Sequence, residues 1–301
     1  MNQKLEELLQ LALQTSEETR ERTEELNVGF DGNTRTWELI VKYHGSLDVL
    51  KTLNIQVEYL IAGYAVLTVP EQLVDRVVEL EEIEYVEKPK RYFYEVEMPT
   101  DNSCIAQVTF RDPYLSGAGV LVAVLDSGID YRLPEFRKRD GSTRILYFWD
   151  QTLQPEVQNP DARPDEGSDE FVRRPPEGFA LGVEFDSVQI NRALEAVNLQ
   201  QQFELLPSVD SSGHGTAVAG IAAGNSTVYQ GVAPEADLLI VKLGQPDASS
   251  FPRTTEIMRA VTYTINKAIE LRMPVVINLS FGNTYGAHDG SSLLERFMDN
   301  A

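Results

Sequence analysis

The sequence feature that most constrains the fold is an apolar run, residues 119–125, which ends in Asp126 and continues directly into Ser127-Gly128. A short apolar run bounded by glycine predicts a strand buried on both faces, as in parallel sheets. Chemistry in open α/β sheets gathers at the carboxyl ends of the strands, which is where Asp126 stands. The sequence therefore predicts an α/β fold with a mostly parallel central sheet and a functional carboxylate at its edge.

A second ionisable residue, His214, stands in a comparable context further along the chain. It follows Ser212-Gly213 and opens a run of small residues, 215–224, which is suited to a tightly packed helix. An acid that orients a histidine, and a histidine that takes a proton near neutral pH, are two parts of a Ser-His-Asp triad. Taken alone, an aspartate after a strand is more often a turn residue and such a histidine a helix cap. Catalysis is predicted only if further motifs accompany the pair.

Four motifs resemble those of the subtilisin-like serine proteases (subtilases) and occur in the family's order. They are Asp126–Asp130, Gly213–Thr216, Gly231–Ala236 and Val276–Gly282. The acid precedes the base and no nucleophilic serine motif has yet appeared, which fits the subtilisin order and neither of the other two common triad orders. The resemblance is closest to the clostridial germination-type (Csp-like) subtilases. It implies that Asp126 and His214 are catalytic and that Ser280, Phe281 and Gly282 bind substrate.

The family's nucleophile follows a Gly-Thr-Ser pattern, and its oxyanion asparagine follows a strand that ends in Gly-Asn. Neither pattern occurs after Gly282. Ser291 and Ser292 precede an amphipathic stretch, and because serine is a favoured helix N-cap, we interpret them as a cap and not as a nucleophile. The chain is therefore interpreted as part of a serine endopeptidase that works through an acyl-enzyme, and residues 1–301 alone are expected to be inactive. Two alternatives stay open: a non-catalytic subtilase-like binding or regulatory module, and a prodomain-led inhibitor or chaperone of another protease.

The N-terminal part predicts a separate, small α+β domain. We predict an amphipathic helix over 3–26. The residues after it predict a strand over 37–43, a helix over 47–53, a pair of strands over 56–69, a helix over 70–82 and a strand over 84–89. This is the ferredoxin-like order, and the resemblance implies that residues 1–97 are a propeptide or inhibitor-like domain. Residues 98–301 are then the N-terminal part of the catalytic domain, with an insertion over about 150–207 in which one helix is expected from Ser187 to about Leu199.

The resemblance also implies which partners the chain has. We expect a protein or peptide substrate, the C-terminal remainder of the protein, and the chain's own prodomain in the substrate cleft. The prodomain tail, Tyr92 to Met98, is expected to lie along Ser280-Phe281-Gly282, and self-cleavage is expected between Glu95 and Ile105. The opposite edge of the cleft is expected near residues 248–250.

Composition and charge exclude several function classes. The formal net charge of −21 argues against a nucleic-acid partner, whose phosphates would be repelled. No apolar run is long enough to span a bilayer, and the charged N-terminus is no secretory signal, so a cytoplasmic or spore-associated bacterial protein is expected. Cys104 is the only cysteine, which excludes an internal disulfide.

A calcium site is the one cofactor that the sequence brings into question. Glu135 matches a position at which the family places a calcium ligand. One carboxylate is too few, because a hard cation takes several oxygen ligands. No cofactor is therefore expected, and calcium stays an open alternative.

Overall fold

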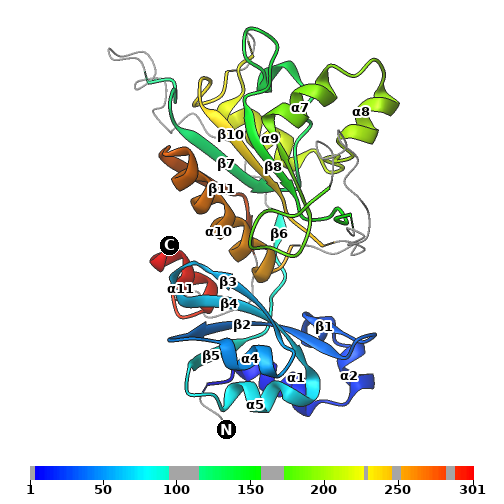
Figure 1. Ribbon diagram of the computed structural model, residues 1–301, viewed down its shortest axis with the longest axis vertical. Coiled ribbons are helices and arrows are strands. Elements are labelled where there is room, and N and C mark those ends of the chain that lie inside the picture. The colour runs from blue at the N-terminus through cyan, green and yellow to red at the C-terminus, as the bar shows by residue number, and fades with distance from the viewer. Residues whose placement is uncertain (1–3, 95–114, 157–172, 227–229, 246–251, 283–288) are drawn as a thin grey trace. The chain divides into compact units, whose positions relative to one another are not determined.

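The chain folds into two compact units (Figure 1). The computed structural model describes residues 4–94, 115–156, 173–226, 230–245, 252–282 and 289–301. The first unit contains Met1–Tyr92, Phe251–Thr262 and Asn283–Ala301, and the second contains Phe93–Ser250 and Tyr263–Gly282. Two segments from the C-terminal part of the chain therefore belong to the first unit, together with the N-terminal residues.

The sheet of the first unit has a ferredoxin-like arrangement. Its elements in chain order are β2 (Thr36–Tyr43), α4 (Asp48–Thr52), β3 (Gln56–Leu60), β4 (Tyr64–Pro70), α5 (Val74–Val78) and β5 (Ile83–Glu87). The strands lie in the order β5-β2-β4-β3 with every neighbour antiparallel, and a short strand β1 (Phe30–Asp31) pairs with the start of β2. The order of elements predicted from the sequence is confirmed.

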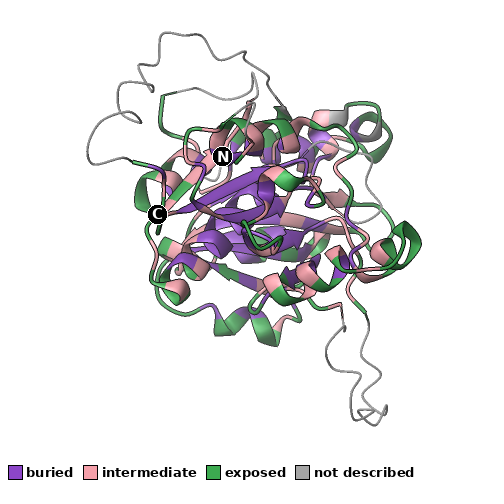
Figure 2. Ribbon diagram, turned by 90° about the horizontal axis from the view of Figure 1, so that it is seen from above, coloured by how far each residue is buried: buried purple, intermediate pink, exposed green. Residues whose placement is uncertain are grey.

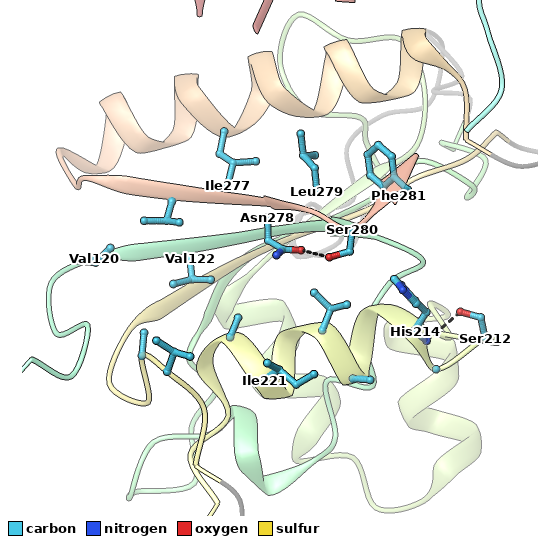
Figure 3. A pocket seen from close by; sticks show the side chains of 17 residues that line it. Val120, Val122, Ser212, His214, Ile221, Ile277, Asn278, Leu279, Ser280 and Phe281 are labelled. Atoms are coloured by element: carbon cyan, nitrogen blue, oxygen red, sulfur yellow. Dashed lines mark hydrogen bonds between the residues drawn. The ribbon is translucent and has the colours of Figure 1, made fainter. Parts of the chain in front are cut away.

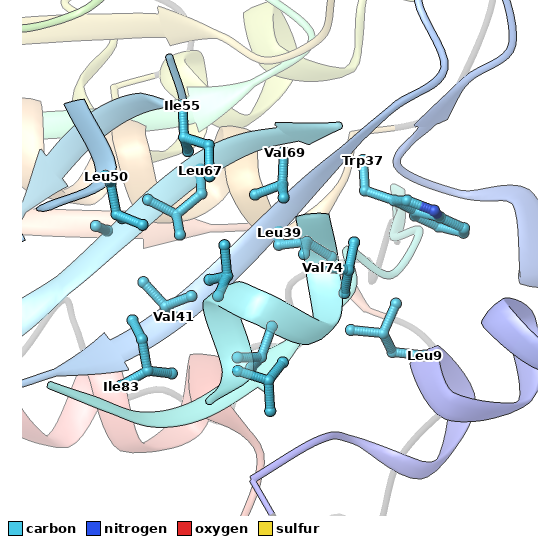
Figure 4. Packing of buried hydrophobic residues seen from close by; sticks show 14 of the residues in the cluster. Leu9, Trp37, Leu39, Val41, Leu50, Ile55, Leu67, Val69, Val74 and Ile83 are labelled. Atoms are coloured by element: carbon cyan, nitrogen blue, oxygen red, sulfur yellow. The ribbon is translucent and has the colours of Figure 1, made fainter. Parts of the chain in front are cut away.

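One face of this sheet carries the hydrophobic core of the first unit (Figure 4). Trp37, Leu39 and Val41 of β2 all lie in it, because successive side chains of a strand point to opposite faces. Helices α1 (Glu7–Gln14), α4 and α5 cover this face, each with fully buried aliphatic side chains. Full burial of one such side chain is worth about 1.5–3 kcal/mol, so this face is the main source of the unit's stability.

The prediction of a single amphipathic helix over residues 3–26 is wrong. The structure has three short helices there: α1, α2 (Glu17–Glu21) and α3 (Glu24–Asn27). Thr15 and Ser16 have extended backbone between α1 and α2. Hydroxyl side chains compete for backbone hydrogen bonds and favour helix ends over helix interiors, which explains the break.

The helix expected from Pro70 to about Glu82 is also shorter than predicted. Pro70 is the last residue of β4, a 3-10 turn covers Glu71–Leu73, and α5 ends at Val78. Proline without a backbone N–H is tolerated at a strand end as well as at a helix start. Proline is also favoured at the first position of a helix, so Pro70 is compatible with either element and did not determine where the helix begins.

The opposite face of the same sheet carries an ionic cluster, formed by buried Glu58 of β3, by buried Glu256 and Arg259 of the segment Phe251–Thr262, and by partly buried Glu38 of β2 and Arg253. Arg259 places Nη2 2.6 Å from Glu58 Oε2 and Nη1 2.9 Å from Glu38 Oε1. Arg253 Nη2 is 2.5 Å from Glu38 Oε2. Burial acts to raise the pKa of Glu38, but Arg253 and Arg259 outweigh it and lower that pKa to about 2. Both arginines therefore face ionised carboxylate at neutral pH.

Removal of one arginine from this cluster should be strongly destabilising. Arg259→Met leaves Glu58 buried without its guanidinium, and breaking a buried ion pair from one side costs about 3–5 kcal/mol. The measurement is the free energy of unfolding from urea titration. The control is Arg22→Met, which removes the exposed pair between Arg22 and Glu18 and should change that free energy by less than about 1 kcal/mol. Equal effects of the two substitutions would contradict the cluster's structural role.

The second unit is built on a five-stranded sheet in the order β11-β7-β10-β8-β9. Its strands are β7 (Leu121–Asp126), β8 (Ile145–Asp150), β9 (Val183–Asp186), β10 (Asp237–Lys242) and β11 (Val275–Leu279). The first four in the sheet are parallel, and β9 is antiparallel at the edge. Every residue of β7 is buried, and Figure 2 shows in purple the strands that carry most of the buried residues. The predicted parallel sheet is confirmed, and Asp126, Asp150 and Lys242 meet at the carboxyl edge of its central strands.

Helices cover both faces of this sheet (Figure 3). On one face, α9 (His214–Ala223) packs closely on β7: a Cβ at Gly215 would lie 2.2 Å from the Gly128 carbonyl oxygen, so only glycine fits. On the other face, the ring of Tyr263 in α10 (Thr254–Leu271) lies 4.9 Å from that of Trp149 in β8. The helix predicted from the small residues after His214 is confirmed. None of the helices in the described ranges has the length and apolar character that crossing a bilayer requires.

The insertion over 150–207 adds structure that the sequence did not predict. It contributes the edge strand β9 and two helices, α7 (Ser187–Leu194) and α8 (Leu199–Leu205), whereas one helix to about Leu199 was expected. The Asn198 side chain accepts a hydrogen bond from Gln201 N and so begins a new helix. At the base of the insertion, the Ser208 hydroxyl donates to the buried carboxylate of Asp150. The insertion is therefore closed at its base and attached to the central sheet.

Candidate active site

Asp126 and His214, which lie far apart in the sequence, are in direct contact. Asp126 is the last residue of β7 and His214 is the first residue of α9. The imidazole Nδ1 lies 2.6 Å from Asp126 Oδ1, with side-chain exposures of 8% for His214 and 0% for Asp126. Gly213, the residue before the helix, has a φ of 74°. A glycine adopts this left-handed conformation without strain, which lets the chain turn sharply into the helix and deliver His214 to the strand end.

The environment of Asp126 favours a short, strong hydrogen bond to the histidine. Burial raises the pKa of Asp126, while hydrogen bonds from His214 and from Ser127 N, which is 2.6 Å from Oδ1, act in the opposite direction. When the Asp126 carboxylate is ionised it can only accept hydrogen bonds, so its contact with Nδ1 favours the imidazole tautomer that carries the proton on Nδ1 and can accept one at Nε2. The pair is thus arranged to take a proton from a third group at Nε2.

A groove of about 920 Å³ opens beside His214 (Figure 3). Its polar end is formed by Ser212, His214, Asn278 and Ser280, and most of its other lining side chains are apolar residues of β7, α9 and β11. The Ser280 hydroxyl donates to Asn278 Oδ1 at 2.8 Å. Such a concave, mostly apolar surface with a few convergent polar groups is typical of a substrate or ligand site.

The predicted substrate-binding residues border this groove. Ser280 and Phe281 line it, and Phe281–Gly282 form the short strand β12. β12 pairs antiparallel with β6 (Phe93–Tyr94), with Phe281 opposite Tyr94 and Gly282 opposite Phe93. The pairing predicted between the tail and Ser280-Phe281-Gly282 is confirmed for these residues, whereas 95–98 lie outside the described residues. An extended segment that adds a strand to this edge is bound mainly through its backbone.

Ser292 and His44 belong to the first unit, and Asp126 and His214 belong to the second. The Ser292 side chain accepts a hydrogen bond from Glu295 N at the start of α11 (Leu293–Asn300), so the predicted N-cap is confirmed. His44 Nδ1 lies 3.4 Å from Glu84 Oε1 on the exposed surface of the first unit. His288 and the expected cleft edge at 248–250 lie outside the described residues.

Glu135 is the residue at which the sequence raised the question of calcium. Within the described residues, no group of three or more His, Cys, Asp or Glu side chains is placed to hold a metal ion. The backbone carbonyl of Glu135 accepts hydrogen bonds from Asn225 N at 3.0 Å and from Arg144 Nη2 at 2.8 Å. The described geometry therefore gives Glu135 a structural role in holding these two segments together.

Asp210 is a residue next to the site that the sequence analysis missed. Its carboxylate accepts hydrogen bonds from Ser127, which follows Asp126, and from Gly213, which precedes His214. The signal in the sequence is weak, because an aspartate three residues before a glycine is an ordinary turn or cap pattern. Only the fold shows that Asp210 also reaches the end of the strand that carries Asp126.

Comparisons with known proteins cover both parts of the chain. A family model described as the Csp protease B prodomain matches residues 3–90, and one described as the subtilase family matches residues 117–300. In the solved structure of the Clostridium perfringens CspB protease, the similar region is 33% identical, with a TM-score of 0.52 over 65% of this chain and 35% of that one.

Two curated proteases show the same likeness at lower identity. The subtilisin-like protease PopC of Myxococcus xanthus is 26% identical over 170 residues, which is 56% of this chain and 26% of PopC. The minor extracellular protease Vpr of Bacillus subtilis is 25% identical over 174 residues, which is 58% of this chain and 15% of Vpr. The chain thus spans about a quarter or less of the length of these curated relatives.

Proposed function

Because this chain belongs to the subtilase family, we propose that Asp126 and His214 are the acid and base of a serine endopeptidase whose nucleophile is supplied from outside residues 1–301. The observation that carries the proposal is the 2.6 Å contact between Asp126 Oδ1 and His214 Nδ1 at the polar end of the groove. Asp126 is fully buried and holds Nδ1, which leaves Nε2 as the nitrogen that takes the proton.

The proposed reaction is acyl transfer in two steps. Nε2 of His214 removes the proton of the serine hydroxyl while the serine oxygen attacks the carbonyl carbon of the substrate peptide bond. His214 then gives this proton to the departing amine, and an acyl-enzyme remains. In the second step, His214 takes a proton from water, the resulting hydroxide oxygen attacks the ester, and the serine recovers its proton. Asp126 stabilises the imidazolium throughout, and backbone N–H groups stabilise the oxyanion.

The chain's own N-terminal domain is the first proposed occupant of the substrate cleft. Phe93–Tyr94 already pair with Phe281–Gly282 in the register of an added antiparallel strand. An extended peptide substrate would use the same backbone groups, so the tail and a substrate would compete. We therefore assign the N-terminal domain the role of a propeptide-type inhibitor, released by self-cleavage between Glu95 and Ile105.

Activity measurements on residues 1–301 test where the nucleophile lies. Purified residues 1–301 should show no turnover of peptide substrates and no labelling by a serine-directed fluorophosphonate, because an acid–base pair without a nucleophile forms no acyl-enzyme. The Ser212→Ala and Ser280→Ala variants serve as matched controls, since Ser212 and Ser280 are the two serines that line the groove beside His214. Turnover by residues 1–301 that Ser212→Ala or Ser280→Ala abolishes would contradict the proposal that the nucleophile lies elsewhere.

The same assay on a longer protein that carries the family's Gly-Thr-Ser pattern separates the two main functions. Turnover and fluorophosphonate labelling there support the endopeptidase. Absence of both would instead favour the non-catalytic binding or regulatory module, because the groove and its paired tail would be present without chemistry.

A further inference from the structure

The start of α9 is capped from a distance and not by its own N-cap residue. Gly213 stands at the N-cap position and has no side chain to offer a hydrogen bond. Asp210 caps the helix instead, because its Oδ1 accepts from Gly213 N at 3.0 Å and its Oδ2 accepts from Thr216 N at 2.9 Å and from Thr216 Oγ1 at 2.6 Å. Capping of exposed backbone donors in the first turn stabilises a helix start by about 1 kcal/mol. His214 is the residue between these capped positions.

The same carboxylate also reaches the end of β7. The Ser127 hydroxyl donates to Asp210 Oδ1 at 2.8 Å, and it accepts a hydrogen bond from Gly215 N at 2.9 Å. Ser127 directly follows Asp126, and Gly215 directly follows His214. One short network therefore joins the neighbours of the acid to the neighbours of the base.

Asp210 is itself held in place by the base of the insertion. The Ser208 hydroxyl donates to the Asp150 carboxylate at the end of β8, and Lys242 Nζ, at the end of β10, donates to the Val209 carbonyl at 2.8 Å. Lys242 Nζ also lies 3.6 Å from Asp150 Oδ2. The two residues before Asp210 are thus attached to two strands of the central sheet.

Asp210 is charged at neutral pH. Burial acts to raise its pKa, but hydrogen bonds from Thr216, Ser127 and Gly213 outweigh burial and lower the pKa below its ordinary value. A charged acceptor makes stronger hydrogen bonds than a neutral one. The carboxylate can therefore hold several donors of the loop and the helix at once.

We propose that Asp210 is a positioning residue, which sets the distance and orientation of His214 against Asp126 without touching the imidazole. The proposal rests on the proposed function of the Asp126–His214 pair. The contact between them is only 2.6 Å, so a small shift of the first turn of α9 relative to the end of β7 would lengthen it. The close approach of Gly215 to Gly128 is made by backbone atoms, and the Asp210→Asn substitution keeps the Cβ of residue 210, so the helix should stay docked when Asp210 is changed.

The test compares Asp210→Asn with a matched substitution elsewhere in the second unit. Asparagine keeps the shape of the side chain but removes the charge, and its amide nitrogen cannot accept from Thr216. Asp140→Asn is the control, because Asp140 Oδ1 likewise accepts from a backbone N–H and a hydroxyl, both of Ser142, on the exposed surface. The readout is the nitrogen NMR spectrum of the imidazole in residues 1–301, which has only three histidines. It reports the Nδ1–H hydrogen bond without any need for activity.

We expect Asp210→Asn to weaken or abolish the signal of the Nδ1–H hydrogen bond of His214, and Asp140→Asn to leave it unchanged. In the active protease, Asp210→Asn should lower kcat by about 10²-fold with KM unchanged, since misplacement of a catalytic group by about 1 Å costs that much. If Asp210→Asn does not fold, Ser127→Ala decides instead, because it breaks the network at Ser127 and leaves the hydrogen bonds from Gly213 and Thr216 to Asp210 in place.

Two outcomes would overturn the proposal. One is an unchanged Nδ1–H signal in a folded Asp210→Asn variant, or in Ser127→Ala if the first variant is unfolded. The other is the same loss of signal in Asp140→Asn. Asp126→Asn is measured alongside and must abolish the signal. If it does not, the acid–base pair itself is misassigned, which is a failure of the proposed function and not of the positioning role.

Discussion

Replacement of His214 by alanine in the active protease is expected to lower kcat by about 10⁶-fold, which is the usual cost of removing the base of a serine protease triad. His214 is the one group at the polar end of the groove that can both take the serine proton and return it to the leaving amine. The measurement is kcat for hydrolysis of a peptide substrate, with the thermal unfolding midpoint as evidence that the variant is folded.

The control for this prediction is His44→Ala. His44 is exposed, pairs with Glu84 in the first unit and should be replaceable without a change in rate. A folded His214→Ala variant that keeps kcat within about tenfold of the parent protein would show that another group is the base.

Replacement of Asp126 by asparagine is expected to lower kcat by about 10⁴-fold. The asparagine amide can donate to Nδ1, which favours the imidazole tautomer with its proton on Nε2, so the nitrogen that faces the serine no longer accepts a proton. Asp126 is fully buried and 2.6 Å from Nδ1, so water cannot readily replace it in this role. The measurement is kcat across the neutral pH range, with Asp140→Asn as the exposed control.

A loss in Asp126→Asn of less than about tenfold would mean that the orientation of His214 does not depend on this carboxylate. If kcat falls strongly and the Asp126→Asn variant is also unfolded, the cause is the loss of the fold and not the wrong imidazole tautomer. The thermal unfolding midpoint of Asp126→Asn is therefore compared with that of His214→Ala, which removes a side chain that is 8% exposed.

The position of the acid–base pair could be predicted because two local patterns determine it. The buried apolar run of β7 sets where the strand ends, and the small residues of α9 set where the helix begins. The ferredoxin-like order of elements could be predicted for the same reason. The alternation of buried and less buried residues at the start of β2 and the turn at Ala62-Gly63 are local features. Such patterns depend on neighbours a few residues apart, and sequence shows these directly.

The parts that could not be predicted depend on contacts between distant residues. The ion pair between Arg253 and Glu38 joins residues 215 positions apart, and nothing in the composition of either segment indicates its partner. The network of Asp210 was missed for the same reason, since its contact with Ser127 spans 83 positions. The break between α1 and α2 is different, because Thr15 and Ser16 are a local signal for it that the leucine pattern over 3–26 obscures.

The central claim is that Asp126 and His214 act together as the acid and base of a protease that processes its own N-terminal domain. The most direct measurement is the mass spectrum of the purified, intact protease and of its His214→Ala variant. We expect two fragments for the parent protein, separated between Glu95 and Ile105, and a single uncleaved chain for His214→Ala. Cleavage at the same bond in a folded, homogeneous His214→Ala variant would contradict the central claim.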